Sequence, residues 1–399
     1  MSKLRVNVRQ PFGNGTGRPS RAPIVTGALV ATLLGACTNP AVTGDSGGDS
    51  SVEGIGQALQ VRCVENPKID KPPFDLMPEL RGEGRIPYKP IALKPVCPDG
   101  QVPLVEPRRP AVDRRNPLIA ADRMLGRDPE LEYIDRPEVK ALIPLERVIK
   151  PQQREPLPPD PAGECDGVDS FGSCYYYANA AYSRVADGGG MITTVASPAY
   201  FSTGTGGHTL NEIAVQGGPS NGHIVELGWN LSTDQYGDAH PHLFVFHWND
   251  WNPTCYDGCG WVQYSATYYP GQDLNGIVGR DVYIGYVQYA GNWWAWFDNQ
   301  WLGYFPGGEW PSGYTQNALI QWFGEVASHN GIPPVTDMGN GQFPSGASPA
   351  RMSALCDVDA AAWVCWYRDQ QGTSATVPKY YDIARTGFGR VAYGGDGGG

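Results

Sequence analysis

The sequence predicts an all-β fold, an antiparallel β-sandwich preceded by a small proline-rich N-terminal region. Two observations lead to this expectation. All 12 Trp and 19 of the 21 Tyr fall within residues 165–399, so a large aromatic core belongs to that part. In the same part, short runs of aromatic and β-branched residues alternate with Gly, Pro, Asn and Asp, which is typical of strands joined by tight turns.

Ten runs predict strands, and helix signals between them are scarce. In chain order the runs are MITTVA, NEIAVQ, HIVELGW, HLFVFHW, WVQYSATYY, DVYIGYVQYA, NWWAWF, NQWLGYF, LIQWFGEVAS and ARTGFGRVAYG.

Residues 1–36 predict a signal peptide. They contain five basic residues and no acidic residue, and they end in an apolar run, from Ile24 to Ala36, that is too short to span a bilayer. The run leads into LGAC, which resembles the lipobox of bacterial lipoproteins, whose Cys is acylated. The alternative is an ordinary export signal with an incidental Cys37. We expect export and lipid anchoring through Cys37 to a bacterial membrane, in the periplasm or at the cell surface, with release as an option.

Composition divides the rest of the chain into four parts. Residues 37–59 are rich in Gly, Ser and Asp and predict a flexible tether, and residues 60–147 form a small proline-punctuated region. Residues 148–164 contain five prolines and predict an extended linker. Residues 165–399 are the predicted β domain.

The charge of the chain argues against nucleic acid as a partner. The formal net charge is −11, and without residues 1–36 there are 25 basic and 41 acidic residues. A surface this acidic repels phosphate groups. We expect membrane contact through the lipid anchor alone, and a monomer.

Cysteine usage predicts disulfide bonds, because eight cysteines, an even number, follow Cys37 in a chain that is expected to be exported. Sequence alone leaves about 105 pairings open. The grouping of the cysteines along the chain favours the pairs Cys63–Cys97, Cys165–Cys174, Cys255–Cys259 and Cys356–Cys365. A zinc site on the third pair is less favoured, because no second pair stands at metal-ligand spacing.

Two glutamates stand in otherwise core-like strands. Glu226, in GHIVELGWNL, shares one strand face with two glycines, while the opposite face is apolar. Glu325, in LIQWFGEVAS, follows a glycine and shares a face with Gln321. Burying an unpaired carboxylate is costly, and a glycine in a strand often marks close approach of a ligand or another backbone. The pattern predicts a carboxyl pair in an aromatic-lined cleft.

Seven motifs, in this order and at roughly this spacing, resemble the neprosin family of glutamic peptidases over about residues 170–392. They are HIVELGW, YGD (236–238), HLFVFHW, CYDGCGWVQ (255–263), GNWWAWF (291–297), WLGYFP (301–306) and QWFGEV (321–326). The resemblance implies that Glu226 and Glu325 are the catalytic pair and that Cys255 and Cys259 close a disulfide loop. It also implies activity at acid pH, no metal or cofactor, and cleavage after proline.

Further expectations follow from this resemblance. CPDGQVPLVEPRRP (97–110) is similar to the activation region of the family, so residues 60–147 are expected to be a propeptide, and the linker 148–164 a site of self-cleavage. A proline pocket should be aromatic. The expected substrate-binding residues are Trp293, Trp294, Trp296, Tyr304, Trp322 and Gln321. One departure is Asn211-Glu212, where many relatives have Ser-Gln.

The expected mechanism depends on like charges placed together. Two carboxyl groups that share a proton leave one carboxylate, which draws a proton from water, and one carboxylic acid, which polarises the carbonyl and protonates the leaving nitrogen. The sequence leaves open which glutamate takes which role.

Two other classes of function compete with the peptidase. A glycoside hydrolase on a sandwich fold also uses two acids with aromatic platforms, and a surface lectin would keep the aromatic residues while tolerating loss of both glutamates. A metalloprotease is less favoured. The histidines of HPHLFVFHW, His240, His242 and His247, form no H-E-x-x-H motif, and strand alternation puts the last one on the opposite face.

Overall fold

The computed structural model describes residues 61–76, 78–80, 84–85, 88–105, 165, 173–204, 207–217, 222–329 and 333–398. The predicted signal peptide, Cys37, the tether and the 148–164 linker lie outside these residues. All described residues belong to the compact unit Glu53–Gly399.

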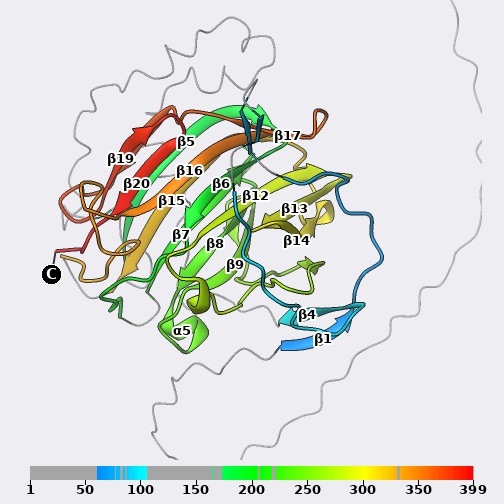
Figure 1. Ribbon diagram of the computed structural model, residues 1–399, viewed down its shortest axis with the longest axis horizontal. Coiled ribbons are helices and arrows are strands. Elements are labelled where there is room, and N and C mark those ends of the chain that lie inside the picture. The colour runs from blue at the N-terminus through cyan, green and yellow to red at the C-terminus, as the bar shows by residue number, and fades with distance from the viewer. Residues whose placement is uncertain are drawn as a thin grey trace, which may run out of the picture. The chain divides into compact units, whose positions relative to one another are not determined.

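Strands dominate the structure (Figure 1). Helical structure in the described chain is limited to α5 (Thr233–Tyr236) and two short 3-10 turns, η1 (Asn275–Ile277) and η2 (Gly307–Glu309). The strands are β1 (Val61–Glu65), β2 (Pro78–Leu80), β3 (Gly84–Arg85), β4 (Gln101–Val105), β5 (Cys174–Ala186), β6 (Gly188–Thr194), β7 (His208–Gln216), β8 (Ile224–Leu231), β9 (His242–Asn249), β10 (Asn252–Pro253), β11 (Val262–Gln263), β12 (Asp281–Tyr289), β13 (Asn292–Phe297), β14 (Gln300–Pro306), β15 (Asn317–Ser328), β16 (Ala350–Asp359), β17 (Val364–Tyr367), β18 (Gly372–Ala375), β19 (Asp382–Gly387) and β20 (Arg390–Gly394).

Two large sheets pack face to face, which confirms the predicted sandwich. The seven-stranded sheet has the order β10-β9-β8-β7-β15-β5-β18. The eleven-stranded sheet has the order β11-β14-β13-β12-β6-β16-β17-β2-β3, with β20 paired to β16 and β19 to β20. Within these sheets every described pair is antiparallel except β2 with β17. Strands β1 and β4 form a separate two-stranded sheet.

Strand alternation produces three apolar layers instead of one core. The largest cluster lies between the two sheets, where β8 contributes Val225, Leu227 and Trp229. A second cluster, with Trp294 and Trp301, covers the outer face of the eleven-stranded sheet. A third lies on the outer face of the seven-stranded sheet and is built on β5, β7, β8, β9 and β15. Because each strand sends alternate side chains to opposite faces, both faces of both sheets are apolar.

The N-terminal segment, residues 61–105 as far as they are described, docks on the outer face of the eleven-stranded sheet. Its main anchor is Asp298, which is fully buried between β13 and β14. The backbone N–H of Ile91 donates to both Asp298 oxygens over 3.1 and 3.0 Å, and the Tyr88 hydroxyl donates to Oδ1. In addition, the Trp301 indole donates to the carbonyl of Phe74 over 3.1 Å. The segment therefore satisfies this buried carboxylate together with Tyr268 of the sandwich, whose hydroxyl donates to Oδ2 over 3.0 Å.

Several strands are present where no strand was predicted, of which β5 and β16 are the longest, and one predicted strand is much shorter. Strand β5, CYYYANAAYSRVA, and strand β16, ARMSALCDVD, carry many Ala and polar residues. The run WVQYSATYY forms a strand only at Val262–Gln263, because the Ser265 hydroxyl accepts hydrogen bonds from the N–H groups of Thr267 and Tyr268 and turns the chain.

Among the described helices, none has the length and apolar character needed to cross a bilayer.

Candidate active site

Glu226 lies in the middle of β8 on the outer face of the seven-stranded sheet. The neighbouring strand β9 pairs Glu226 with Phe246, and Trp248, two residues further on, donates its indole N–H to Oε1 of Glu226 over 2.8 Å. The carboxyl group is fully buried. On the opposite strand face, the Tyr286 hydroxyl of the other sheet donates to the backbone carbonyl of Glu226 over 3.2 Å, which fixes the strand at this position.

Glu325 lies on β15, on the same outer face, and is equally buried. Its contact is a histidine that the sequence analysis missed. His208, the first residue of β7, places Nε2 2.6 Å from Oε1 of Glu325. The second oxygen, Oε2, has no hydrogen-bond partner in the described chain.

The register of β7 separates the two glutamates. On β8, Glu226 pairs with Ala214 of β7, which pairs with Gln321 of β15. Glu325 pairs with Leu210, four residues further along β7. Four residues span about 13 Å along a strand, and two strand spacings add about 10 Å across the sheet. No hydrogen bond joins the two carboxyl groups within the described residues, so they do not hold a proton between them by direct contact.

Glu212 occupies the position between them. It faces the same side of β7, pairs with Gly228 on β8 and with Phe323 on β15, and is fully buried. Its diagonal neighbours are Glu226 on one side and Glu325 on the other, at Cβ distances of about 7–8 Å in a regular sheet. Three carboxyl groups therefore form a diagonal row across β8, β7 and β15. Burial, together with the charges of Glu226 and Glu212, raises the pKa of Tyr286 well above its usual range.

The glycines near the acids serve the packing of the sheets. A Cβ on Gly228 would lie 1.9 Å from the carbonyl oxygen of Asn211, so glycine permits the close approach of β7 and β8 and leaves no side chain opposite Glu212. A Cβ on Gly324 would lie 2.6 Å from the Tyr393 ring. The predicted close approach is thus to another backbone and to a ring.

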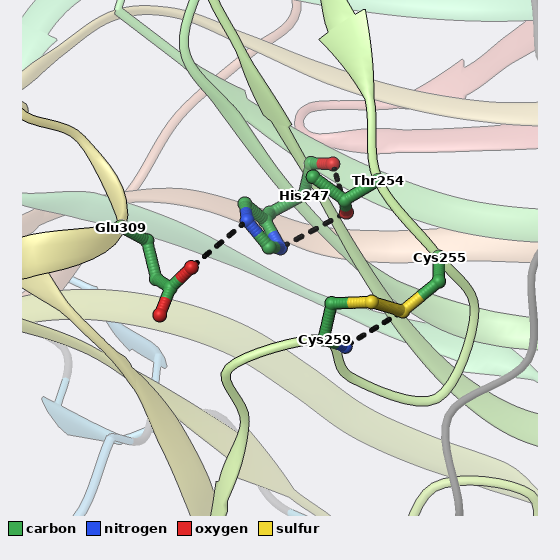
Figure 2. The surroundings of a disulfide bond; sticks show 5 residues. All are labelled: His247, Thr254, Cys255, Cys259 and Glu309. Carbon is green, nitrogen blue, oxygen red and sulfur yellow. Dashed lines mark hydrogen bonds and ion pairs between the residues drawn. A yellow bond between two sulfur atoms is a disulfide. The ribbon is translucent and has the colours of Figure 1, made fainter. Parts of the chain in front are cut away.

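Aromatic side chains surround the row of carboxyl groups. Phe244, Phe246 and Trp248 of β9 and Phe323 of β15 belong to the same outer cluster. Tyr256 packs on the two β9 phenylalanines at ring-centroid distances of 5.7 and 5.0 Å. Tyr256 lies in the loop closed by the predicted Cys255–Cys259 disulfide, which is present (Figure 2). The loop therefore forms one wall beside Glu226.

The structure places most of the predicted substrate-binding residues elsewhere. Trp293 and Trp322 lie in the core between the sheets, and their indoles donate to the carbonyls of Tyr314 and Gly190. The remaining aromatic residues of the predicted set lie on the outer face of the eleven-stranded sheet: Trp294, Trp296 and Tyr304. Only Gln321 shares the face of the glutamates, where its Oε1 accepts from Gln216. The prediction of a pocket built by these five aromatic residues is therefore wrong for this structure.

Three of the four predicted disulfides are confirmed. Their Sγ atoms are bonded in the pairs Cys63–Cys97, Cys255–Cys259 and Cys356–Cys365. The fourth prediction is wrong for this structure, because Cys165 and Cys174 are not joined by a disulfide. Both are buried in the core between the sheets, and both lie close enough to Tyr176 to raise the pKa of its hydroxyl, an effect dominated by burial.

The three clustered histidines take separate roles. His242 is buried, stacks on Tyr236 at 4.1 Å, and places Nε2 2.9 Å from Asp238. His247 points between the sheets, with Thr254 on one side of its ring and Glu309 on the other (Figure 2). His240 lies in a half-exposed group with Asp238 and Asp273, whose ligand atoms fall within 4.8 Å of one another. This group has the composition of a weak cation site but is equally an ordinary surface ion pair, since His240 contacts Asp273 at 3.0 Å.

In the comparison with known proteins, a family model matches the region that holds all three glutamates. Residues 206–396 match the neprosin family model. The neprosin match runs from β7 to β20 and includes Glu212, Glu226 and Glu325 together with the Cys255–Cys259 loop. It supports a peptidase. A comparison with curated proteins finds no match to this chain.

Three solved structures resemble the chain at low identity. A scytalido-glutamic peptidase with a peptide-based transition state analogue is 12% identical, with a TM-score of 0.32, and the alignment covers 55% of this chain and 97% of that chain. SCP-B, an Eqolisin family peptidase in complex with a tripeptide, is 11% identical, with a TM-score of 0.31 and coverage of 55% and 98%. CG-16, a homodimeric agglutinin from chicken liver, is 13% identical, with a TM-score of 0.24 and coverage of 37% and 93%. At these TM-scores the three resemblances carry no argument about function. The argument about function rests on the neprosin match and on the geometry of the site.

Proposed function

We propose that the chain is a glutamic endopeptidase that hydrolyses peptide bonds with Glu226 and Glu325. One observation carries the proposal: two buried glutamates face the same side of one sheet within the neprosin-matching region, and a donor from a neighbouring strand holds one oxygen of each. Because a buried carboxyl group is costly to keep, such a pair is retained where its proton chemistry is used.

The contacts favour a division of roles. Glu325 acts as the general base, because the His208 imidazole, a side chain that can carry charge, holds Oε1, and Oε2 takes the proton of water as the water oxygen attacks the peptide carbonyl carbon. Glu226 carries a proton and gives it to the amide nitrogen as the carbon–nitrogen bond breaks. The substrate backbone would cross β7 between them, over Glu212. A carboxylic acid that must hold its proton works best at acid pH, so the proposal includes an acid optimum.

The aromatic residues beside Glu226 suit an uncharged ring. Phe244, Phe246, Trp248 and Tyr256 form a surface without ionisable carboxyl or amino groups next to the proposed acid. A proline side chain offers only apolar contact, and aromatic rings bind it well. We therefore propose cleavage after proline, with this group replacing the tryptophans predicted from the sequence.

Burial of the three glutamates closes the site to substrate in the state described here. This supports a zymogen. The proposed activation is cleavage in cis within the proline-rich linker 148–164, and the proposed location is outside the cytoplasm, with Cys37 as a lipid anchor. Both proposals depend on sequence outside the described residues.

Hydrolysis of proline-containing peptides by the purified full chain, measured between about pH 3 and pH 7, tests the function. The expected result is cleavage by the wild type, loss of at least about 100-fold in kcat for Glu226→Gln and for Glu325→Gln, and unchanged kcat for Glu309→Gln, a glutamate of the η2 turn. Full peptidase activity in either active-site variant would contradict the proposal. Release of sugar from glycosides without peptide hydrolysis would favour a glycoside hydrolase instead.

Self-processing has its own test. The wild type is shifted to acid pH and the new N-terminus is sequenced, with Glu226→Gln as the control. We expect a cut within 148–164 in the wild type alone. An identical cut in the control would show that another protease makes it.

A further inference from the structure

We propose that His208 is a positioning residue for the proposed peptidase, one that holds Glu325 in a single orientation so that Oε2 meets the attacking water. The proposal rests on the proposed function. His208 has no role in the motifs that indicated the family, and it does not touch substrate in the proposed geometry; it acts through Glu325.

The contact is short and enclosed. His208 Nε2 lies 2.6 Å from Glu325 Oε1, and the two side chains are 3% and 1% exposed. In the register of β7 and β15, His208 pairs with Ala327 and Leu210 pairs with Glu325, so the two residues are diagonal neighbours on one face. When Glu325 is a carboxylate, the N–H of His208 donates to it, and hydrogen bonds to a charged acceptor are the strong class.

The two oxygens of Glu325 are thereby made different. Oε1 is occupied by His208, whereas Oε2 has no hydrogen-bond partner in the described chain although it is buried. A buried oxygen left in this way is uncommon, and one explanation is a functional ligand that the protein itself does not supply. Without His208 the carboxyl group could rotate about its last bond, and either oxygen could turn away from the water.

The surroundings of His208 keep its ring in place. The Tyr175 ring of β5 meets it edge-on, with centroids 6.1 Å apart and an interplanar angle of 71°. Other ionisable groups on this face include Glu212, on the same strand, Glu226, on β8, and Tyr177, on β5. Glu325 is the group that the imidazole contacts directly. The His208 ring is therefore held in place with its Nε2 against the Glu325 carboxylate.

Three variants test the proposal on the full chain, with kcat and KM measured on one proline-containing peptide. His208→Phe keeps the ring volume and removes the donor, and we expect kcat to fall about 10- to 100-fold with KM changed less than about threefold, because misplacing a reacting group costs rate more than binding. His208→Gln retains an N–H donor at similar reach, and we expect its kcat to be at least about tenfold higher than that of His208→Phe. His242→Phe is the matched control, a buried histidine on the same sheet face that contacts Asp238, with kcat within about twofold of wild type.

The outcomes separate this proposal from the proposed function. If Glu325→Gln is inactive while His208→Phe keeps the wild-type kcat, the role of His208 is overturned and the peptidase stands. If Glu325→Gln remains active, the peptidase proposal fails first. An equal loss in folded His208→Phe and His208→Gln also overturns the positioning role, since the amide donor should restore it. If His208→Phe does not fold, His208→Leu, which also lacks the donor, takes its place: a fall in kcat of about 10- to 100-fold supports the positioning role, and a wild-type kcat in the folded variant overturns it.

Discussion

Trp248 donates its indole N–H to Oε1 of Glu226 over 2.8 Å, across the pair of strands β9 and β8. This hydrogen bond fixes one oxygen of the proposed acid just as His208 fixes one oxygen of the proposed base. The two glutamates thus receive donors of different kinds, an indole that cannot carry charge and an imidazole that can. The asymmetry is what distinguishes their proposed roles.

Loss of this indole donor should impair catalysis. For Trp248→Phe, which keeps a ring in the wall, we expect kcat/KM to fall about tenfold, equivalent to about 1.4 kcal/mol, since the one hydrogen bond that orients the buried proposed acid is lost. The control is Trp229→Phe on β8, whose indole donates to the Thr194 carbonyl over 3.0 Å between the sheets. It should lower stability and leave kcat/KM unchanged. Equal catalytic loss in both variants would mean that only packing matters.

Glu212 should set the upper pH limit of activity. Its carboxylate lies diagonally next to Glu226, and a neighbouring negative charge favours the protonated form of the proposed acid. Glu212→Gln removes that charge, so the proton on Glu226 is lost at lower pH. We expect the alkaline limb of the kcat/KM profile to move down by about 0.5 to 1 pH unit, with activity retained at the optimum. A shift upward, or no shift, would show that Glu212 does not act on the pair.

Asp298 should hold the N-terminal segment to the sandwich. Asp298→Asn preserves the left-handed backbone at this position, φ 60°, which Asn tolerates, but it cannot accept all the bonds from Ile91, Tyr88 and Tyr268. We expect a loss of about 2–3 kcal/mol in the free energy of unfolding and faster amide exchange in residues 88–105. The control is Asp281→Asn, which removes an exposed pair with Arg351 and should change stability by less than about 0.5 kcal/mol.

His247 should make the fold less stable in acid. Burial lowers the pKa of His247 from 6.5 to about 4. Between these values the unfolded chain binds a proton that the folded chain does not, so stability is lost as the pH falls from about 6.5 to about 4, by at most about 3 kcal/mol, and no loss arises above 6.5. Glu309 lies 3.7 Å from His247, but burial raises the pKa of the Glu309 carboxyl group. The ion pair therefore offsets little of this loss of stability.

Urea unfolding at several pH values checks this expectation. His247→Gln should show a flatter decline between about pH 6.5 and pH 4 than the wild type, whatever its stability at neutral pH. His240→Gln changes a half-exposed histidine just before β9, and it should keep the wild-type dependence of stability on pH. A wild-type slope in His247→Gln would assign the acid sensitivity to other groups.

The fold was predictable where aromatic and β-branched residues mark strands, as in DVYIGYVQYA and NWWAWF, which became β12 and β13. Strand β5 was missed because its alanines carry no strand preference of their own; its place in the sheet comes from pairing with β15 along its length. Local sequence does not report such pairing.

The site was predictable in part. Alternation put Glu226 on a strand face with two glycines and Glu325 on a face with Gln321, and both glutamates do lie on one outer face. The register of β7 between them depends on long-range pairing, so neither the four-residue offset nor the position of Glu212 could be foreseen. His208 stands alone before a short run and gives no local signal. The tryptophans were misassigned because tryptophan is buried both between the sheets, as Trp293 and Trp322 are, and on the outer face of the eleven-stranded sheet, and composition cannot tell these places from the proposed site.

The anchors of the N-terminal segment lie on the outer face of the eleven-stranded sheet, whereas the three glutamates lie on the outer face of the other sheet. Its disulfide, Cys63–Cys97, closes within the segment and does not tie it to the sandwich. A single cut in the linker would therefore yield a two-chain protein, whose light chain co-elutes on gel filtration without a covalent link and separates only in denaturant. Exposure of the glutamates and retention of the light chain would then be independent events.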